Sequence, residues 1–148
     1  KQVWYTHPSG DFRLPLPQGW SVAAKRLFDE ADDAFDTLWP PEGMAILCAR
    51  EGSDHKNEAA DRVLKRYADE TVKENPGARS ENIRVGAAQA VRIASYDPEA
   101  KVMHWHLKLV VKSRSYNFSI AMPADKQPTA LPKAVADILA GAQMRGEF

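Results

Sequence analysis

The chain has 148 residues and a mass of 16.5 kDa, which predicts one domain over residues 1–148. Hydrophobic residues make up 44% and charged residues 27%, so the composition excludes a disordered chain, a collagen and a small disulfide scaffold. Twenty basic residues balance twenty acidic ones, and the net charge of zero indicates no bulk attraction to nucleic acid or to an anionic membrane. No apolar run approaches the roughly 18 residues of a membrane-spanning helix, so we expect no transmembrane segment.

The first 25 residues predict short extended segments broken by proline and glycine. Trp4-Tyr5 predicts a short strand, and residues 8–10 predict a turn. Because the two prolines in residues 12–20 each remove a backbone donor, that segment predicts an edge strand or an extended lead-in and excludes a central strand. Residues 20–25 predict a further strand.

The next 25 residues combine an acidic run with two predicted strands. Five carboxylates lie between Asp29 and Asp36, which is typical of a solvated loop. Phe35–Trp39 predicts a strand that ends at the following two prolines. Met44–Ala49 is apolar at every position, as in a strand covered on both faces, and this favours a fold of three layers.

The longest predicted helix runs from Lys56 to Glu74. Its apolar residues recur at spacings of three and four, which places them on one face. Ser53 or Asp54 can cap its first turn, and Asn75-Pro76-Gly77 ends it.

Three long strands are predicted after this helix: residues 82–96, with an interruption allowed at Gly86, residues 102–112 and residues 115–122. The period of two in the middle strand divides its side chains between two faces. The core face is predicted to hold Met103, Trp105, Leu107, Leu109 and Val111, continued by Tyr116, Phe118, Ile120 and Met122. The other face is predicted to hold Val102, His104, His106, Lys108, Val110 and Lys112.

A last helix is predicted from about Ala130 to Ala140, with Thr129 as its cap and Gly141 at its end. The element order is therefore strands, helix, strands, helix, and the turns between the strands have hairpin length. This order predicts the α+β class, with an antiparallel sheet sandwiched by helices.

Three segments of the sequence resemble PsbP-like domains. They are Phe12-x4-Pro17-x-Gly19-Trp20 near the start, Ile83–Ala90 after the first helix, and Arg114–Pro123 before the last helix. This superfamily includes the extrinsic PsbP subunit of photosystem II, lipoproteins such as LpqN, a nuclear Ran-binding protein and chaperones for type VI secretion effectors. The resemblance implies an α/β/α sandwich that serves as an accessory or binding module, without enzymatic activity and without cofactors. The superfamily has no shared active-site motif, so no catalytic residue is carried over.

His104 and His106 are the sharpest chemical candidates in the sequence. Alternate strand residues point the same way about 6.5 Å apart, a spacing at which two histidines can share a metal ion. Alignment of the predicted core faces places His104 opposite Ala94, and His106 between Arg92 and Ala121. A cation and two alanines make a poor metal shell, so we expect surface or helix-packing histidines, and the pair remains a weak metal candidate.

The same alignment predicts a basic binding face for an acidic partner or an anionic ligand. Its members are Arg92, His104, His106, Lys108 and Lys112. The alternative is a solvated strand face on which lysine stems cover the sheet.

Two further candidates are weaker. The carboxylates of Asp29–Asp36 lack the alternating spacing and the glycine of a calcium loop, so we expect no calcium site there. Cys48 lies in an apolar run, where a buried structural side chain is expected and a nucleophile is not.

The sequence therefore predicts a non-enzymatic accessory domain that binds a protein partner and not nucleic acid. We expect an extracytoplasmic location, as a secreted or lipoprotein-derived domain. A cytoplasmic chaperone for secretion effectors is the alternative, and a small metal-dependent enzyme is the less favoured one.

Overall fold

The computed structural model describes residues 1–25, 35–42 and 47–148. The helices are α1 (Ala60–Glu74) and α2 (Lys133–Ala140). The strands are β1 (Val3–Thr6), β2 (Phe12–Leu16), β3 (Ser21–Lys25), β4 (Phe35–Trp39), β5 (Leu47–Asp54), β6 (Arg79–Val85), β7 (Ala88–Asp97), β8 (Val102–Val111), β9 (Arg114–Pro123) and β10 (Gln143–Met144).

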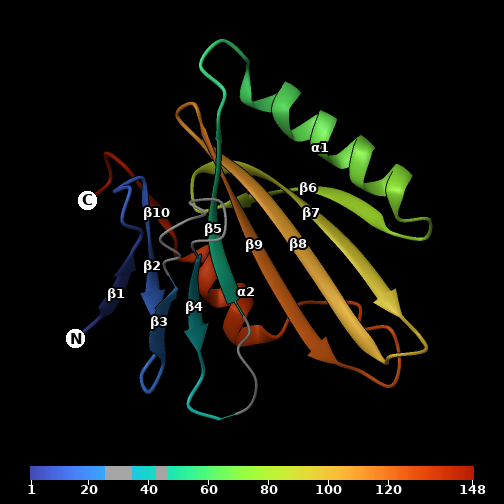
Figure 1. Ribbon diagram of the computed structural model, residues 1–148. Helices are drawn as coiled ribbons and strands as arrows, with labels where there is room; N and C mark the ends of the chain where they lie inside the picture. The colour runs from blue at the N-terminus through green and yellow to red at the C-terminus, as the bar shows by residue number, and fades with distance from the viewer. Residues whose placement is uncertain (26–34, 43–46) are drawn as a thin grey trace.

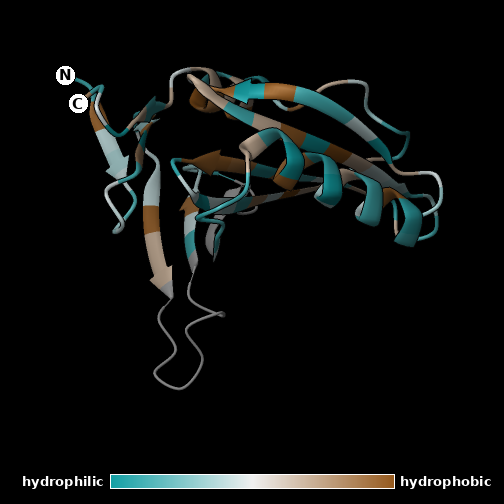
Figure 2. Ribbon diagram, turned by 90° about the horizontal axis from the view of Figure 1, so that it is seen from above, coloured by the Kyte–Doolittle hydropathy of each residue, from teal (hydrophilic) through white to brown (hydrophobic). Residues whose placement is uncertain are grey.

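Most of the strands form one seven-stranded antiparallel sheet in the order β3-β4-β5-β9-β8-β7-β6. A second, three-stranded sheet has the order β1-β2-β10. The two helices lie on opposite sides of the large sheet, with α1 on the near side in Figure 1 and α2 behind it (Figures 1 and 2). The predicted α+β sandwich with an antiparallel sheet is confirmed.

The sheet carries an apolar cluster on each face. The larger one joins β8 and β9 to α2 and to the small sheet, and includes Phe12, Leu107, Phe118 and Ile138. All five predicted core residues of β8 are buried on this face, which confirms the period-of-two assignment. The smaller cluster packs α1 against the other face, where Val91 and Ile93 meet the helix.

The first helix begins four residues later than predicted, at Ala60. Ser53 and Asp54 do not cap it, because both still belong to β5. The next residue, His55, donates its backbone N–H to the Ser113 carbonyl oxygen at 2.6 Å, so the chain is held to the sheet there. The predicted end is right: the Asn75 backbone N–H bonds to the Thr71 carbonyl oxygen just after the last helical residue.

The predicted strand over residues 82–96 is a hairpin of β6 and β7 that turns at Gly86. Gly86 has φ +57°, and a Cβ there would overlap the carbonyl oxygen of Ala142, so only glycine fits both the turn and the close approach. Its N–H also donates to the Leu139 carbonyl oxygen at 3.2 Å. The hairpin is thereby fixed to the end of α2.

The prediction that the proline-containing segment is no central strand is wrong for β2, which lies between β1 and β10. Pro15 is tolerated because it pairs only with Trp4 of β1, whereas β10 pairs with Phe12 and Arg13. This arrangement places the two chain ends on the same side of the molecule, at the small sheet (Figures 1 and 2). The Arg13 guanidinium lies 4.0 Å from the centre of the Trp4 ring and 4.6 Å from that of Phe148.

The last helix begins at Lys133, three residues later than predicted. Pro132 occupies the N-cap position, so the predicted cap Thr129 lies three residues too early. Gly141 ends the helix as predicted. Asp29–Asp33 and Met44–Ile46 lie outside the described residues. Asp36, predicted to be solvated, is instead 3% exposed within β4 and accepts a hydrogen bond from the Tyr5 hydroxyl at 2.5 Å.

Candidate binding face on strand β8

Three ionisable side chains lie in a row on one face of β8: His104, His106 and Lys108, hereafter the His–Lys row. All three are partly buried. The two imidazole rings are stacked, with centroids 6.2 Å apart and an angle of 4° between their planes. The row lies on the face that α1 partly covers, because Ile93 pairs with His106 and Val91 with Lys108.

The predicted neighbours of the row on β7 are wrong by one residue. Ser95 lies opposite His104 and Ile93 opposite His106, in place of Ala94 and Arg92. Strand β7 carries apolar side chains on both faces, and the prediction assigned Ile93 to the Trp105 core although it packs under α1. A shift of one residue moves every side chain of a strand to the other face.

Arg92 therefore does not belong to the predicted basic face. It pairs with Leu107 and lies on the opposite side of the sheet, where its guanidinium forms an ion pair with Glu81. Lys112 follows the end of β8 in the turn to β9, with φ +60°, and is exposed. Of the five predicted residues, the structure gathers only the His–Lys row.

On β9 the predicted neighbour is displaced by two residues. Ala121 lies opposite His104, and Ser119 lies opposite His106. The Ser119 hydroxyl is 3.4 Å from Nδ1 of His106, and Asn117 faces Lys108. On the β9 side, a hydroxyl and an amide group therefore border His106 and Lys108, and such groups hydrogen-bond to anions without adding charge.

Two members of the row have a pKa below the ordinary value. Burial, with the neighbouring His104, lowers the pKa of His106, and burial together with the positive charge of Arg66 lowers the pKa of Lys108. The Lys108 ammonium lies 4.9 Å from the centre of the Tyr67 ring of α1. No carboxylate of a described residue forms an ion pair with any member of the row. The protonated forms of the row therefore lack a counter-charge within the described residues.

A metal ion has few ligands here. Among the described residues, His, Cys, Asp and Glu side chains nowhere gather in groups of three that could hold one. His104 and His106 thus find no third ligand in this part of the chain. The Cys48 side chain and most of the acidic run lie outside what the structure describes.

Sequence reasoning missed a polar cluster of Ser9, Asp11, Tyr116 and Arg145, hereafter the Asp11 cluster, in which Asp11 and Tyr116 are buried and Arg145 is exposed. The Tyr116 hydroxyl donates to Oδ2 of Asp11 and lies 2.8 Å from Oγ of Ser9. Nε of Arg145 donates to Oδ1 of Asp11 at 2.8 Å. His7 adjoins it, with Nδ1 accepting the Ser9 backbone N–H at 3.1 Å.

The Asp11 cluster shifts both of its titratable acids. Burial alone would raise the pKa of Asp11, but hydrogen bonds from Tyr116 and Arg145 and the charges of Arg145 and Arg114 hold it below its ordinary value. Burial and the hydrogen bond to Asp11 raise the pKa of Tyr116 to about 12. The cluster ties the loop before β2 and the C-terminal segment to β9, which is a structural role.

The architecture was compared with solved structures. A protein from Bacteroides thetaiotaomicron superposes with a TM-score of 0.61 at 12% identity, over 97% of this chain and 48% of that chain. This chain therefore spans about half the length of that protein. The solution structure of cyanobacterial PsbP (CyanoP) from Synechocystis sp. PCC 6803 superposes with a TM-score of 0.56 at 11% identity, over 97% of this chain and 92% of that chain. The chain has the PsbP-like fold.

A third structure extends this comparison to the lipoprotein that the sequence resemblance named. LpqN of Mycobacterium tuberculosis, described as involved in cell envelope biogenesis, superposes on this chain with a TM-score of 0.54 at 13% identity. The match covers 98% of this chain and 91% of LpqN. No protein-family model and no curated protein matches the sequence. Within the described residues, neither α1 nor α2 meets the length and hydrophobicity that a bilayer crossing requires.

Proposed function

We propose that this PsbP-like chain is a non-catalytic accessory domain that binds an acidic segment of a protein partner through the His–Lys row. The observation that carries the proposal is the row itself, in which no described carboxylate balances Lys108 or the two histidines. An incoming carboxylate would remove that deficit. It would also favour the charged form of Lys108, whose pKa is lowered by burial and by the positive charge of Arg66.

The surroundings of the row favour a polypeptide partner. Ser119 and Asn117 on β9 provide neutral hydrogen-bonding groups beside His106 and Lys108, and Ser95 on β7 provides one beside His104. Helix α1 packs over β6, β7 and part of β8, while neither α1 nor α2 lies in front of the lower half of β8 and β9 (Figure 1). An extended acidic segment can lie along these uncovered strands, whereas a small molecule needs a concave site.

We place this function outside the cytoplasm, as the resemblance to secreted and lipoprotein members implies. The likeness to the fold of LpqN, described as involved in cell envelope biogenesis, supports this location. Fractionation of the native source with an antibody against the protein tests it. Recovery in the cytoplasmic fraction would favour the chaperone role in its place.

Binding is tested with a fluorescein-labelled decaglutamate peptide, followed by fluorescence anisotropy at two salt concentrations. Lys108→Gln is expected to weaken binding about tenfold, the effect of losing about 1.4 kcal/mol of charge-assisted contact. Lys73→Gln is the matched control, because Lys73 is an exposed lysine in the last turn of α1. Binding by the wild type should also weaken as salt rises, because added ions screen exposed charges.

A chaperone that holds apolar helical segments would give the opposite pattern. It would bind an apolar helical peptide in high salt, and Lys108→Gln would leave that affinity unchanged. Equal decaglutamate affinities for Lys108→Gln and Lys73→Gln would refute the role of the His–Lys row.

A further inference from the structure

A second surface, distinct from the His–Lys row, lies at the outer edge of the sheet. Strand β6 is the last strand in the order, and among the described strands it pairs with β7 alone. Seven consecutive residue pairs, from Arg79 with Ala94 to Val85 with Ala88, join the two strands without a bulge. In an antiparallel pair about half of a strand's backbone groups point away from its partner. No backbone group of β6 makes an outward hydrogen bond to another described residue.

Edge strands are ordinarily guarded by charged side chains, prolines or bulges. Strand β6 has no proline and no bulge, and two of its charged side chains are turned back onto the hairpin. Glu81 forms an ion pair with Arg92 on β7, and Nη1 of Arg84 donates to the Ala87 carbonyl oxygen at 3.0 Å. The edge is therefore long and regular, and its third charged side chain, Arg79, lies at its first residue.

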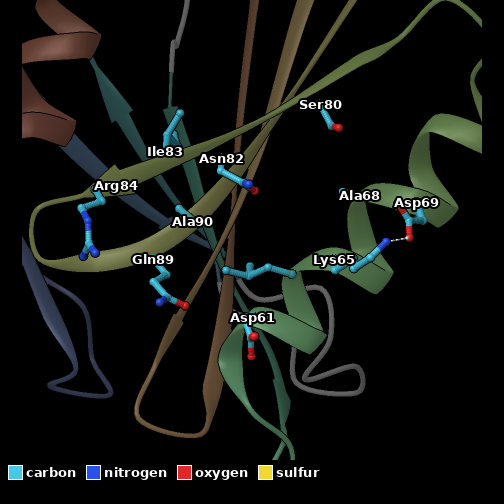
Figure 3. A pocket seen from close by; sticks show the side chains of 11 residues that line it. Asp61, Lys65, Ala68, Asp69, Ser80, Asn82, Ile83, Arg84, Gln89 and Ala90 are labelled. Carbon is cyan, nitrogen blue, oxygen red and sulfur yellow. Dashed lines mark hydrogen bonds and ion pairs between the residues drawn. The ribbon is translucent and has the colours of Figure 1, made fainter.

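A cleft of about 730 Å³ runs along β6 on the side of α1. In Figure 3, Asp61, Lys65 and Asp69 of the helix line one wall, and Ser80, Asn82 and Arg84 of β6 line the other. Lys65 and Asp69 neutralise each other at 2.8 Å. The hydroxyl of Ser80 and the amide of Asn82 make no hydrogen bond to a described residue. Both groups are therefore available to hydrogen-bond to a molecule in this cleft.

A second cleft, of about 410 Å³, adjoins β6 on the opposite face of the sheet. Arg79 and Glu81 of β6 line its rim, Met103 and Trp105 contribute apolar surface, and the segment 127–129 closes another side. Successive residues of a strand point to opposite faces. A strand added beside β6 would therefore turn its side chains alternately toward a polar cleft and toward a partly apolar one.

We propose that β6 binds an extended polypeptide segment of another protein as an eighth strand of the sheet. Main-chain hydrogen bonds to the free edge would supply the affinity, and the two clefts would select a segment in which polar and apolar side chains alternate. The polar set faces Ser80 and Asn82, and the apolar set faces Trp105. This binding site is independent of the proposed acidic-partner function.

The test begins with selection of a twelve-residue peptide from a phage-displayed library against the full chain. The selected peptide is then synthesised in two forms, each N-methylated at one of the two sets of alternate residues, and binding is measured by calorimetry. Because only one edge of an added strand pairs with β6, one form should lose at least tenfold in affinity and the other should bind like the parent. Equal losses in both forms, or none in either, would overturn the proposal.

Protein variants locate the site. Asn82→Lys places a lysine on the exposed edge and is expected to abolish binding of the selected peptide. Asn57→Lys is the matched control, because Asn57 is exposed in the turn before α1, and Lys108→Gln should also bind normally. Retained binding by Asn82→Lys would show that the peptide binds elsewhere and would refute the site. A library that yields no peptide would also count against the proposal. So would a wild type that is a dimer and becomes a monomer in Asn82→Lys, because a second copy of the chain would then occupy the edge.

Discussion

The Asp11 cluster gives the most quantitative prediction, through the substitution Tyr116→Phe. The side chain is fully buried, and phenylalanine keeps the ring while removing the hydroxyl that donates to Asp11. A hydrogen bond to a charged group contributes about 1.5–3 kcal/mol, so we expect Tyr116→Phe to lose about 2 kcal/mol of unfolding free energy at pH 7. For a chain of this length that corresponds to a fall in Tm of about 6 °C.

The pH dependence supplies a second, independent signature. The folded pKa of Tyr116, about 12, lies above the ordinary value of 10.0, so the associated stability is complete below pH 10 and is lost as the pH rises through 12. A shift of this size corresponds to about 2.7 kcal/mol at about 1.36 kcal/mol for each unit. The phenylalanine variant cannot ionise, so its deficit relative to the wild type should shrink over this range.

Urea denaturation monitored by circular dichroism, repeated from pH 7 to pH 11.5, measures both effects. Tyr96→Phe is the matched control, because Tyr96 is partly exposed and its hydroxyl donates to a neutral acceptor, the Ala124 carbonyl oxygen, at 2.7 Å. If Tyr116→Phe costs no more than Tyr96→Phe, or if its deficit stays constant above pH 10, the Asp11 cluster does not stabilise the fold in the way argued.

Three other substitutions probe the fold and the His–Lys row. Gly86→Ala should lower the free energy of unfolding, measured by urea denaturation, by more than about 2 kcal/mol, because its Cβ would overlap Ala142. Gly77→Ala, with φ +92° but open space, should lower it by only about 1 kcal/mol. Similar losses in the two variants would contradict this reasoning. Burial and the neighbouring His104 lower the pKa of His106, so the stability tied to its neutral form is present above pH 6.5 and is lost as the pH falls. Thermal denaturation from pH 7.5 to 5 measures this loss. The stability of His106→Gln should fall less over this range than that of the wild type. Leu107→Ala, at a fully buried position, should lose about 2–5 kcal/mol in the same urea assay, and a loss under 1 kcal/mol would place it outside the core.

The sequence pattern predicts elements well where each residue has a single environment. In β8 one face is buried in the main core and the other is half-covered, so the period of two identifies both the Trp105 side and the His–Lys row. In β7 the same reasoning fails, because Val91 and Ile93 pack under α1 while Ala90 faces the main core. Hydrophobicity alone then does not show which side chains of β7 point to which face of the sheet, and the pattern predicts the wrong face for Arg92.

Contacts between distant segments had no sequence signal at all. Asp11 and Tyr116 are separated by 105 positions, and neither belongs to a motif that would predict their hydrogen bond. The late start of α1 has a related cause, since Ser53 and Asp54 have good capping side chains but are held in β5 by the sheet. Tertiary structure decides both cases, whereas the ends of the helices at Asn75 and Gly141 follow from local chemistry.

The position of the chain ends has a practical consequence for these experiments. Both ends belong to the small sheet, where Arg13 contacts Trp4 and Phe148, and that sheet packs on the face of the large sheet opposite the His–Lys row. A biotin or an affinity tag attached at either end would anchor the molecule to a sensor surface with His104, His106 and Lys108 directed toward the solution. Joining the neighbouring ends by a short linker would likewise permit circular permutation, with new termini opened in the exposed turn around Glu99, leaving the row in place.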